Sequence, residues 1–584
     1  MKNDIVKCQN CSSIFTIEQD DFAFYDKIQV PSPTWCPECK MIRRMTWRNE
    51  RILFKKESVM EGGVKKSMLS MYAPETDLNT YDQKYWWSDA WDVLDYGRDY
   101  DFSKPFFTQF SELLHRVPLL ALSNSNAVNS EYCNVADQSK DCYLICSSFK
   151  CERTMYSNRV YHIKDSSDIY IGFNQELCYN NVSCTESYRL FYSLESDSCT
   201  DSYFLYDCKN CTHCFGCVNL RNASYQIFNQ QYSKEEYFKK IEEFNLGSWN
   251  SIQTNRKKFD EIYHGAIHRF ARITKSVDVS GDMIDNAKNC HNCFEVTEGA
   301  QDCKNLHWGG IQTSDAWDSG PGIGDGAQLL YEVMDTGIQS GDIIGGNVVY
   351  GSHNIRYALY CHGSAHLFGC ISVRSKQYCI LNKQFTKEEY EALVPKIIEH
   401  MNAMPYVDKK GREYRFGDFF PPELSPYAYN ESIAQDYFPL TREQAIDRGY
   451  PWRDATQKQY KVDIKAADLP DGITDVGPEV LNKIIGCQHG GSCDDGCSTA
   501  FKITDNELKF YQKMVIPLPR LCFNCRFGER LKKKNTMRLH HRQCMCSQSH
   551  PHHVGQCPNE FETTFEPGRL ESVYCESCYQ AEIM

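Results

Sequence analysis

Four short apolar runs decide the fold class: CYLIC at 142–146, DIYIG at 168–172, YRLFY at 188–192 and YFLYD at 203–207. Asn, Asp, Ser and Cys separate them, which is typical of short strands joined by turns. Similar residues recur at multiples of about nine, at Cys142, Cys151, Ile169 and Cys178. Such a repeat predicts a parallel β-helix, in which stacking completes a core that no rung can bury alone. Cysteine is small and apolar enough to stack inside such a coil.

A second copy of the pattern follows at a constant offset. The first copy has Cys208, His213, Phe215, Gly216, Cys217, Arg221, Tyr225, Ile227, Asn229 and Gln231, and the second has Cys361, His366, Phe368, Gly369, Cys370, Arg374, Tyr378, Ile380, Asn382 and Gln384. Each copy ends in a capping box, Ser233 with Glu236 or Thr386 with Glu389, which predicts a helix over the last rung. We expect one β-helix unit over 119–245 (coil A) and another over 275–402 (coil B), or one interrupted coil.

Both ends of the chain carry a shared cysteine pattern. Near the start it reads Cys8-x-x-Cys11, Phe24-Tyr25 and Cys36-x-x-Cys39, and near the end Cys497, Phe510-Tyr511 and Cys522-x-x-Cys525. Four thiolates supply the tetrahedral soft-ligand shell that Zn²⁺ prefers, and the CxxC spacing lets two sulfur atoms from one turn reach the same ion. The alternative, a pair of disulfides, suits a secreted chain better than a cytosolic one.

These end segments resemble the probable zinc-ribbon family, a treble-clef-like pair of knuckles. The resemblance rests on the CxxC, a phenylalanine four residues later (Phe15 or Phe501), the central Phe-Tyr, a proline, and a CPxC followed by Arg43-Arg44. The whole chain looks like uncharacterised bacterial multi-zinc-ribbon proteins. The resemblance implies a fold and a metal but no activity.

The cysteine pattern and the resemblance predict about three structural zinc ions. The predicted ligands are Cys8, Cys11, Cys36 and Cys39; Cys493, Cys497, Cys522 and Cys525; and Cys546, Cys557, Cys575 and Cys578. Cys487 is the alternative to Cys493, and Cys544 or His553 is the alternative to Cys546. Sites with four cysteine ligands are closed, so we expect this zinc to be structural and not catalytic.

Four further cysteines of coil A, Cys208, Cys211, Cys214 and Cys217, are spaced three residues apart. They could form part of a metal site. However, side chains of a strand alternate between its two faces, and Ser364 and Leu367 replace two of the four in the second copy. Structural thiols are therefore the favoured interpretation.

The remaining segments complete the expected mainly β fold, in which tandem zinc-ribbon or treble-clef modules flank the two coils and helices are few and short. We expect a zinc ribbon over 1–50, a degenerate metal-free ribbon plus aromatic linker over 51–118, a linker over 246–274, an extended connector with one short helix from Thr441 over 403–480, and zinc ribbons over 481–543 and 544–584. In the degenerate ribbon, Asp82 and Tyr85 take the places of Cys575 and Cys578.

The charge pattern suggests a partner. The net charge of -13 argues against a general nucleic-acid coat but leaves room for local basic patches. Basic residues follow the equivalent knuckles at Arg43, Arg44, Arg48 and Arg51, and at Arg530, Lys532, Lys533, Lys534 and Arg538. They predict contacts with RNA or DNA phosphates, and a solvated helix face is the alternative. The first residues lack an apolar signal region and no run is long enough to span a membrane, so we expect a cytoplasmic protein.

Binding is a better hypothesis than catalysis. The sequence contains no nucleophile elbow, Walker loop or HExxH motif. We therefore expect a non-enzymatic, zinc-stabilised scaffold that binds a macromolecule, with RNA or DNA as the first candidate. The alternatives are a carbohydrate-active β-helix enzyme, by analogy of fold alone, and a homo-oligomeric structural protein that assembles through aromatic surfaces such as 72–107.

Overall fold

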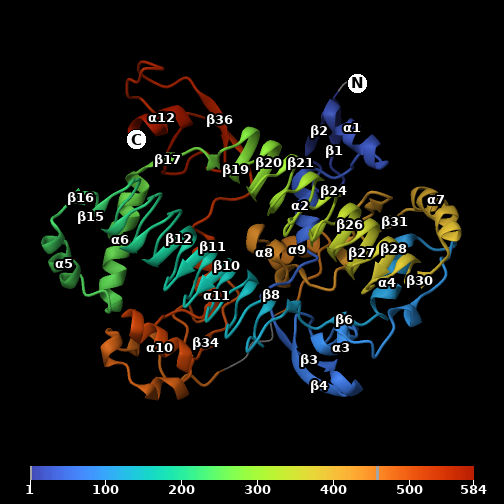
Figure 1. The fold of residues 1–584 in the computed structure, drawn as a ribbon, viewed down its shortest axis with the longest axis horizontal. Coiled ribbons are helices and arrows are strands. Elements are labelled where there is room, and N and C mark those ends of the chain that lie inside the picture. The colour runs from blue at the N-terminus through green and yellow to red at the C-terminus, as the bar shows by residue number, and fades with distance from the viewer. Residues whose placement is uncertain (1–2, 455–459, 584) are drawn as a thin grey trace.

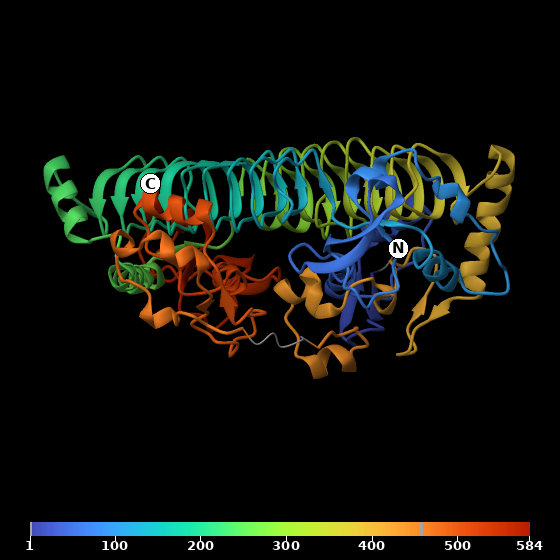
Figure 2. The same ribbon diagram turned by 90° about the horizontal axis from the view of Figure 1, so that it is seen from below.

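The structure, a computed structural model, describes residues 3–454 and 460–583 and is mainly β, as predicted. Two stacks of parallel strands run through the centre of the molecule (Figure 1). The end modules and the connector lie together on one side of these stacks (Figure 2). Within coil A the strand order follows the chain from β7 to β16, and the order in coil B is nearly as regular from β18 to β30. This arrangement confirms the two parallel β-helix-like units.

The strands of coil A are β7 (Asn124–Ser125), β8 (Asn134–Asp137), β9 (Cys146–Phe149), β10 (Asn158–Lys164), β11 (Tyr170–Glu176), β12 (Val182–Phe191), β13 (Thr200–Tyr203), β14 (Thr212–Phe215), β15 (Ser224–Ile227) and β16 (Gln230–Gln231). Those of coil B are β18 (Ile273–Thr274), β19 (Val277–Asp285), β20 (Lys288–Thr297), β21 (Gln301–Lys304), β22 (His307–Gly310), β23 (Ser314–Trp317), β24 (Gln328–Tyr331), β25 (Met334–Gly337), β26 (Gly341–Tyr350), β27 (His353–His362), β28 (Ala365–Ile371), β29 (Gln377–Ile380) and β30 (Lys383–Gln384). Within each coil, only the short last strand pairs antiparallel.

The chain of coil A turns a corner at every third residue. Parallel partners lie one rung apart, as Asn158 pairs with Tyr170 and Tyr170 with Val182. From 135 to 213, every third residue has a left-handed backbone, for example Asn210 with φ 53°. Because a left-handed residue follows each pair of extended ones, side chains repeat in phase with period three and do not alternate. The expected alternation is therefore wrong here, and Cys208, Cys211, Cys214 and Cys217 all point inward with 0% exposure.

The narrow interior of coil A explains its many cysteines and serines. The Cys178 Sγ lies 3.4 Å from the carbonyl of Glu176 and 3.6 Å from that of Ser187 in the next rung. Ser196 Oγ donates to the Leu194 carbonyl at 2.9 Å and accepts from a backbone N–H one rung later. Burial raises the pKa of the Cys178 thiol to about 12, so it stays protonated. These side chains satisfy backbone groups in a space too small for large apolar residues.

Helices close the outer ends of both coils. The structure confirms the two capping boxes, at Ser233 before α5 (Lys234–Glu243) and at Thr386 before α7 (Lys387–Ala403). Tyr237 of α5 and Tyr390 of α7 are buried and pack on the last rungs at equivalent places, beside Tyr225 and Tyr378. Both helices lie at the far ends of the layer (Figure 2).

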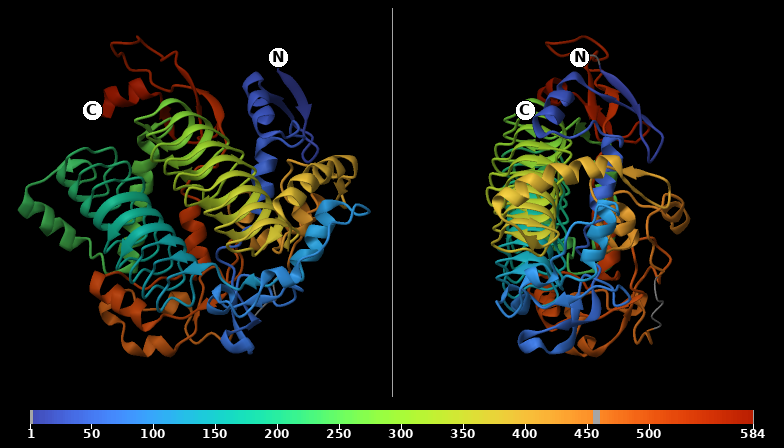
Figure 3. Two further views of the ribbon diagram at one scale, coloured as in Figure 1. Left: turned by 45° about the vertical axis from the view of Figure 1, so that its right-hand side comes forward. Right: turned by 90° about the vertical axis from the view of Figure 1, so that its right-hand side faces the viewer.

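The two coils lie side by side (Figure 3, left). Arg159 of β10 forms an ion pair with Glu295 of β20, and its guanidinium lies 3.5 Å from the ring centroid of Trp308. The segment 246–274, expected to be a linker, is mostly the helix α6 (Trp249–Gly265). It is followed by β17 (Ile267–Arg269), which pairs with β37 (Ser572–Tyr574) of the last module.

The first two end modules share one order of elements, two strands followed by two helices, whereas the last module has three strands before a single helix. The first has β1 (Asp4–Lys7), β2 (Ile14–Ile17), α1 (Gln19–Ile28) and α2 (Pro37–Met45); the second has β33 (Ile485–Gly486), β34 (Ala500–Phe501), α10 (Asp505–Met514) and α11 (Phe523–Leu531); the last has β35 (His540–Gln543), β36 (Glu560–Thr563), β37 and α12 (Glu576–Ile583). Both α1 and α10 end at a left-handed residue, Gln29 and Val515. These matching ends support the alignment of the first and second modules.

The segment 51–118 forms β3 (Phe54–Val59), β4 (Lys65–Ser70), β5 (Thr80–Tyr81), α3 (Gln83–Trp87) and α4 (Phe106–Leu114), and β6 (Leu119–Leu120), directly after it, pairs with β5. Asp82 caps α3 by accepting from the Tyr85 N–H at 3.0 Å. A hydrogen bond therefore begins this helix at the position where Cys575 precedes α12.

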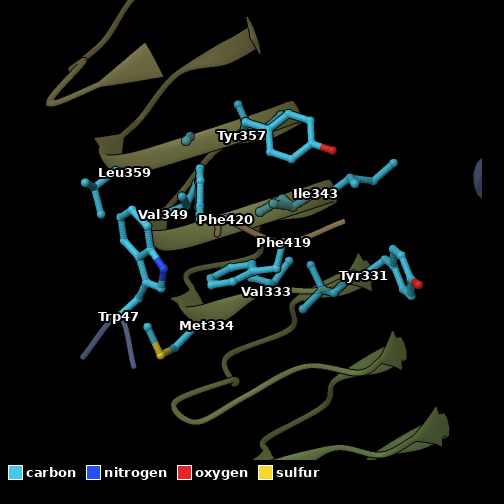
Figure 4. Packing of buried hydrophobic residues seen from close by; sticks show 14 of the residues in the cluster. Trp47, Tyr331, Val333, Met334, Ile343, Val349, Tyr357, Leu359, Phe419 and Phe420 are labelled. Carbon is cyan, nitrogen blue, oxygen red and sulfur yellow. The ribbon is translucent and has the colours of Figure 1, made fainter. Parts of the chain in front are cut away.

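The first part of the connector lies against coil B, and its last part packs with coil A and the second module. The connector contains β31 (Tyr406–Val407), β32 (Glu413–Tyr414), α8 (Ile433–Tyr437) and α9 (Arg442–Asp447), and Thr441 caps α9 as expected. Phe419 and Phe420 of the connector meet Trp47 from the first module over the strands of coil B (Figure 4). One hydrophobic core thus joins the first module, coil B and the connector.

Candidate metal centres

The first candidate centre contains the four predicted cysteines. The sulfur atoms of Cys8, Cys11, Cys36 and Cys39 all lie within 4.8 Å of one another. Cys8 and Cys11 lie at the turn between β1 and β2, and Cys36 is the N-cap of α2. The Cys36 N–H donates to Cys8 Sγ at 3.3 Å, and Asn10 Nδ2 donates to Cys39 Sγ at 3.1 Å. This geometry can hold one metal ion in a four-sulfur shell.

The second centre contains Cys487 in place of the preferred Cys493. Cys487, Cys497, Cys522 and Cys525 form the four-sulfur group. The Cys522 N–H donates to Cys487 Sγ at 3.3 Å, as Cys36 does to Cys8. Cys493 Sγ lies outside this group but 3.5 Å from Cys525 Sγ. Sequence spacing favoured Cys493, because an inserted loop places Cys487 far from Cys497 along the chain.

The third centre contains Cys544 in place of the preferred Cys546. Cys544, Cys557, Cys575 and Cys578 form its four-sulfur group, and all four are buried. Here the Cys575 N–H donates to Cys544 Sγ at 3.2 Å. Cys546 and the other alternative, His553, belong to a neighbouring group that shares Cys578. The knuckle contact therefore identifies Cys8, Cys487 and Cys544 as equivalent members of the three four-sulfur groups.

Hydrogen bonds favour one thiolate in each of the first two centres, while the same contacts raise the pKa of Cys39 and of Cys525. Contacts from Cys36 and Cys39 lower the pKa of Cys8, and contacts from Cys487 and Cys525 lower the pKa of Cys522. Thiolates are the form that binds metal. The close approach of four sulfur atoms in each centre is what suits it to a divalent cation.

The basic residues after the first knuckle do not face solvent. Arg43 and Arg44 are fully buried, and both form ion pairs with Glu332 of coil B, at 2.7 Å and 2.9 Å. Arg48 is paired with Asp335. These side chains were predicted to contact nucleic acid, but their charges are already neutralised inside the protein. This part of the prediction is therefore corrected: these arginines join the first module to coil B.

Arg51 is also engaged. Its guanidinium lies 2.6 Å from Asp436 and 3.9 Å from the ring centroid of Phe527 in α11. Arg51 therefore links the connector to the second module and is not free for phosphate.

The second module contacts coil A in a matching way. Arg530, at the place of Arg44, lies 2.6 Å from Asp168, which Arg526 also approaches at 3.1 Å. Lys534, at the place of Arg48, lies 2.6 Å from Glu295 of coil B. Burial alone would raise the pKa of Glu295, but Arg159 and Lys534 lower it to about 2.

Three predicted phosphate contacts remain at the surface. Lys532 has a side chain that is 68% exposed and lies 2.9 Å from Asp495, and Lys533 is exposed. Arg538 forms an exposed ion pair with Glu38 of the first module at 2.5 Å. Of the nine predicted positions, only these could meet a phosphate without breaking a buried ion pair.

Sequence reasoning missed the acidic partners. Asp168, Asp318 and Glu332 are buried, and each lies at a left-handed corner of a coil. Lys40 of α2, which belongs to the basic segment after the first knuckle, lies 2.5 Å from Asp318. The sequence signal that could have revealed them is the three-residue repeat of the coils. It places these carboxylates at the corners of the coils, where they can meet a docked module, and not in the interior.

These features define a class of protein: a mainly β chain of two parallel coils, with cysteine clusters compact enough to bind metal and compatible with zinc-ribbon-like modules. No protein-family model and no curated protein matches the chain. Within residues 3–454 and 460–583, no helix is both long and apolar enough to cross a membrane.

Proposed function

We propose that the protein is a zinc-stabilised scaffold that binds a macromolecular partner and is not an enzyme. The observation that carries this proposal is the knuckle contact repeated in three four-cysteine centres, at 3.3, 3.3 and 3.2 Å. Zinc prefers such a tetrahedral sulfur shell, and a shell complete without water has no open position for a substrate. The metal therefore has a structural role in this proposal.

The docking contacts couple each of the first two zinc centres to a coil. Cys36 and Cys522 begin the helices α2 and α11, whose basic side chains reach buried carboxylates of the coils. Because zinc fixes the start of each helix, metal binding and the arrangement of the coils are energetically linked. This linkage supports a scaffold that holds two coils in one geometry.

The outer face of coil A supports binding of an extended partner. Exposed side chains one rung apart pair with each other, as Arg153 does with Asp165 at 2.6 Å and Arg189 with Asp201 at 2.7 Å. Stacked rungs therefore present a regular, pre-ordered surface of the kind that repeat proteins use for binding. Positive and negative groups mix on it, which suits a protein partner better than a phosphate backbone.

The first test is recovery of cross-linked full-length protein from its native cells, with identification of bound protein and RNA and elemental analysis. We expect a reproducibly bound macromolecule and about three zinc ions or more per chain. A chain that contains no zinc contradicts the zinc assignment, and a chain that enriches no macromolecule contradicts the binding role.

Filter binding over a salt series tests nucleic acid as the partner. If Lys532 and Lys533 contact phosphates, replacing both with glutamine reduces affinity and flattens the salt slope by about two units. Lys509→Gln in α10 is the matched control, since Lys509 is also exposed and paired only with a nearby aspartate. If the wild-type protein shows no salt-sensitive binding to RNA or DNA, nucleic acid is excluded as the partner.

A further inference from the structure

We propose that the last module binds a second metal ion next to its four-cysteine centre, in a site that shares Cys578. The new ligands are Cys546, His550 and His553, whose ligand atoms lie with Cys578 Sγ within 4.8 Å of one another. This inference rests on the proposed zinc binding of the module and adds a site to it.

The distances converge on one point. Cys546 Sγ lies 3.3 Å from His550 Nε2, and His553 Nε2 lies 3.1 Å from Cys578 Sγ. Two sulfur and two imidazole ligands form a tetrahedral set that zinc commonly adopts. Separations of this size between ligand atoms suit a single ion between them.

A hydrogen bond prepares His553 for this role. Its Nδ1 lies 2.9 Å from the Gly555 carbonyl, which can only accept a hydrogen bond. Nδ1 must therefore carry the proton, and the lone pair of Nε2 points toward Cys578. Metal-binding histidines are typically oriented by such a bond from the other ring nitrogen.

The inserted loop has few other reasons to hold this shape. Cys8 and Cys11 are separated by two residues, whereas residues 545–556 separate Cys544 from Cys557. All three new ligands lie in this loop, where Val554 is 87% exposed. A loop of this length without an apolar core needs another source of order, and a metal ion can supply it.

Charge also favours a shared thiolate. The four-sulfur centre alone has two more negative charges than its divalent ion can neutralise. A second divalent ion adds two positive charges and only one further thiolate, that of Cys546, because the histidines are neutral ligands. The pair of ions bridged by Cys578 therefore has a smaller net negative charge than the single centre.

The second module provides a useful contrast. Its inserted loop places His489, Cys493 and Asp495 around Cys525 in a similar way. There, however, Lys532 lies 2.9 Å from Asp495 and already neutralises it. We therefore restrict the proposal to the last module.

Two contacts define the alternative. His550 Nε2 also lies 3.3 Å from Glu582, and His552 Nε2 lies 3.3 Å from Cys578 Sγ. Without a metal, a protonated His550 would pair with Glu582 and the histidines would simply cover the sulfur. This arrangement predicts no nitrogen ligand on any zinc ion.

Zinc counting on the full-length protein distinguishes these cases. We expect about four zinc ions per chain, against about three without the shared site. The double variant with His550→Ala and His553→Ala should lose one zinc ion, while the control His541→Ala, an exposed histidine of the same module, should lose none. Three zinc ions in the wild type, unchanged in the double variant, would overturn this inference and leave the proposed function intact. No zinc at all would overturn both.

X-ray absorption at the zinc edge provides a test that needs no variant. The three four-cysteine centres alone give a shell of sulfur only, whereas the shared site adds imidazole nitrogen. A sulfur-only shell in the wild-type protein would refute the shared site even if the double variant failed to fold.

Discussion

Replacing Glu332 with glutamine tests whether the buried basic residues hold the first module on coil B. The Glu332 side chain is fully buried and accepts from Arg43 at 2.7 Å and from Arg44 at 2.9 Å. Glutamine keeps the shape of the side chain but has only one acceptor oxygen. Its NH₂ group would point at the N–H groups of one of the two arginines, so that two donors would oppose each other. Breaking a buried ion pair on one side costs about 3–5 kcal/mol, because the remaining charges stay buried without a partner. We expect the free energy of unfolding to fall by at least the lower of these values.

Urea titration followed by tryptophan fluorescence measures this loss, since Trp35 and Trp47 are buried near the docking site. Glu176→Gln is the matched control on coil A, because its pair with Lys164 is exposed and spans 3.7 Å. An exposed pair contributes no more than about 1 kcal/mol. If Glu332→Gln and Glu176→Gln shift the transition equally, the docking role of Glu332 is wrong.

Two further predictions concern ligand identity and pH. Elemental analysis should show that Cys487→Ser loses one zinc ion and Cys493→Ser loses none, since only Cys487 receives the knuckle hydrogen bond; the opposite result would restore the ligand favoured by spacing. Burial lowers the pKa of His307 to about 3, so stability should begin to fall as the pH drops below 6.5. The pKa of Glu295 is lowered from 4.5 to about 2, so its contribution, about 3 kcal/mol, is complete above pH 4.5 and is lost as the pH falls toward 2. Urea titrations across this range should show both losses, and Glu295→Gln should remove the second; a stability that stays level down to pH 3 contradicts the assignment.

The sequence was sufficient to predict the coils, their caps and most of the cysteines that the fold brings together in four-sulfur groups. Repeats carry this information directly, because the identical residues around Cys208 and Cys361 lie at one offset. The spacing of three is visible in the sequence at Cys208, Cys211, Cys214 and Cys217, but its structural meaning depends on the left-handed residues at the corners, such as Asn210, which only the fold shows. The cysteines of coil A were expected to stack inside the coil, and the fold shows that all four of the closely spaced ones are fully buried.

Two of the predicted cysteines, Cys493 and Cys546, lie outside the four-sulfur groups for a physical reason. Spacing rules assume a tight turn between the first two cysteines, as between Cys8 and Cys11. In the other two modules an inserted loop contains a further cysteine, Cys493 or Cys546, that lies closer in sequence to the second cysteine of the pair. The backbone N–H of the knuckle, however, donates to Cys487 or Cys544. Only the fold shows which sulfur receives the backbone N–H.

The positions of the basic runs follow from which coil each module contacts: the first module contacts coil B, and the second module contacts coil A. The first module docks on coil B, where Lys40 contacts a carboxylate 278 residues further along the chain, and Arg530 of the second module contacts one 362 residues earlier, in coil A. Charge at the same place after both knuckles is then required, because each helix must neutralise buried acidic corners of a coil. A hydrophobic core likewise joins the first module to coil B, and another joins the second module to coil A. In neither case are the module and the coil that it contacts adjacent in the sequence. Loss of metal from either module should therefore weaken a contact between distant parts of the chain. We therefore expect the four-cysteine groups, the docking helices and the coils to unfold together as one unit and not as a row of independent domains.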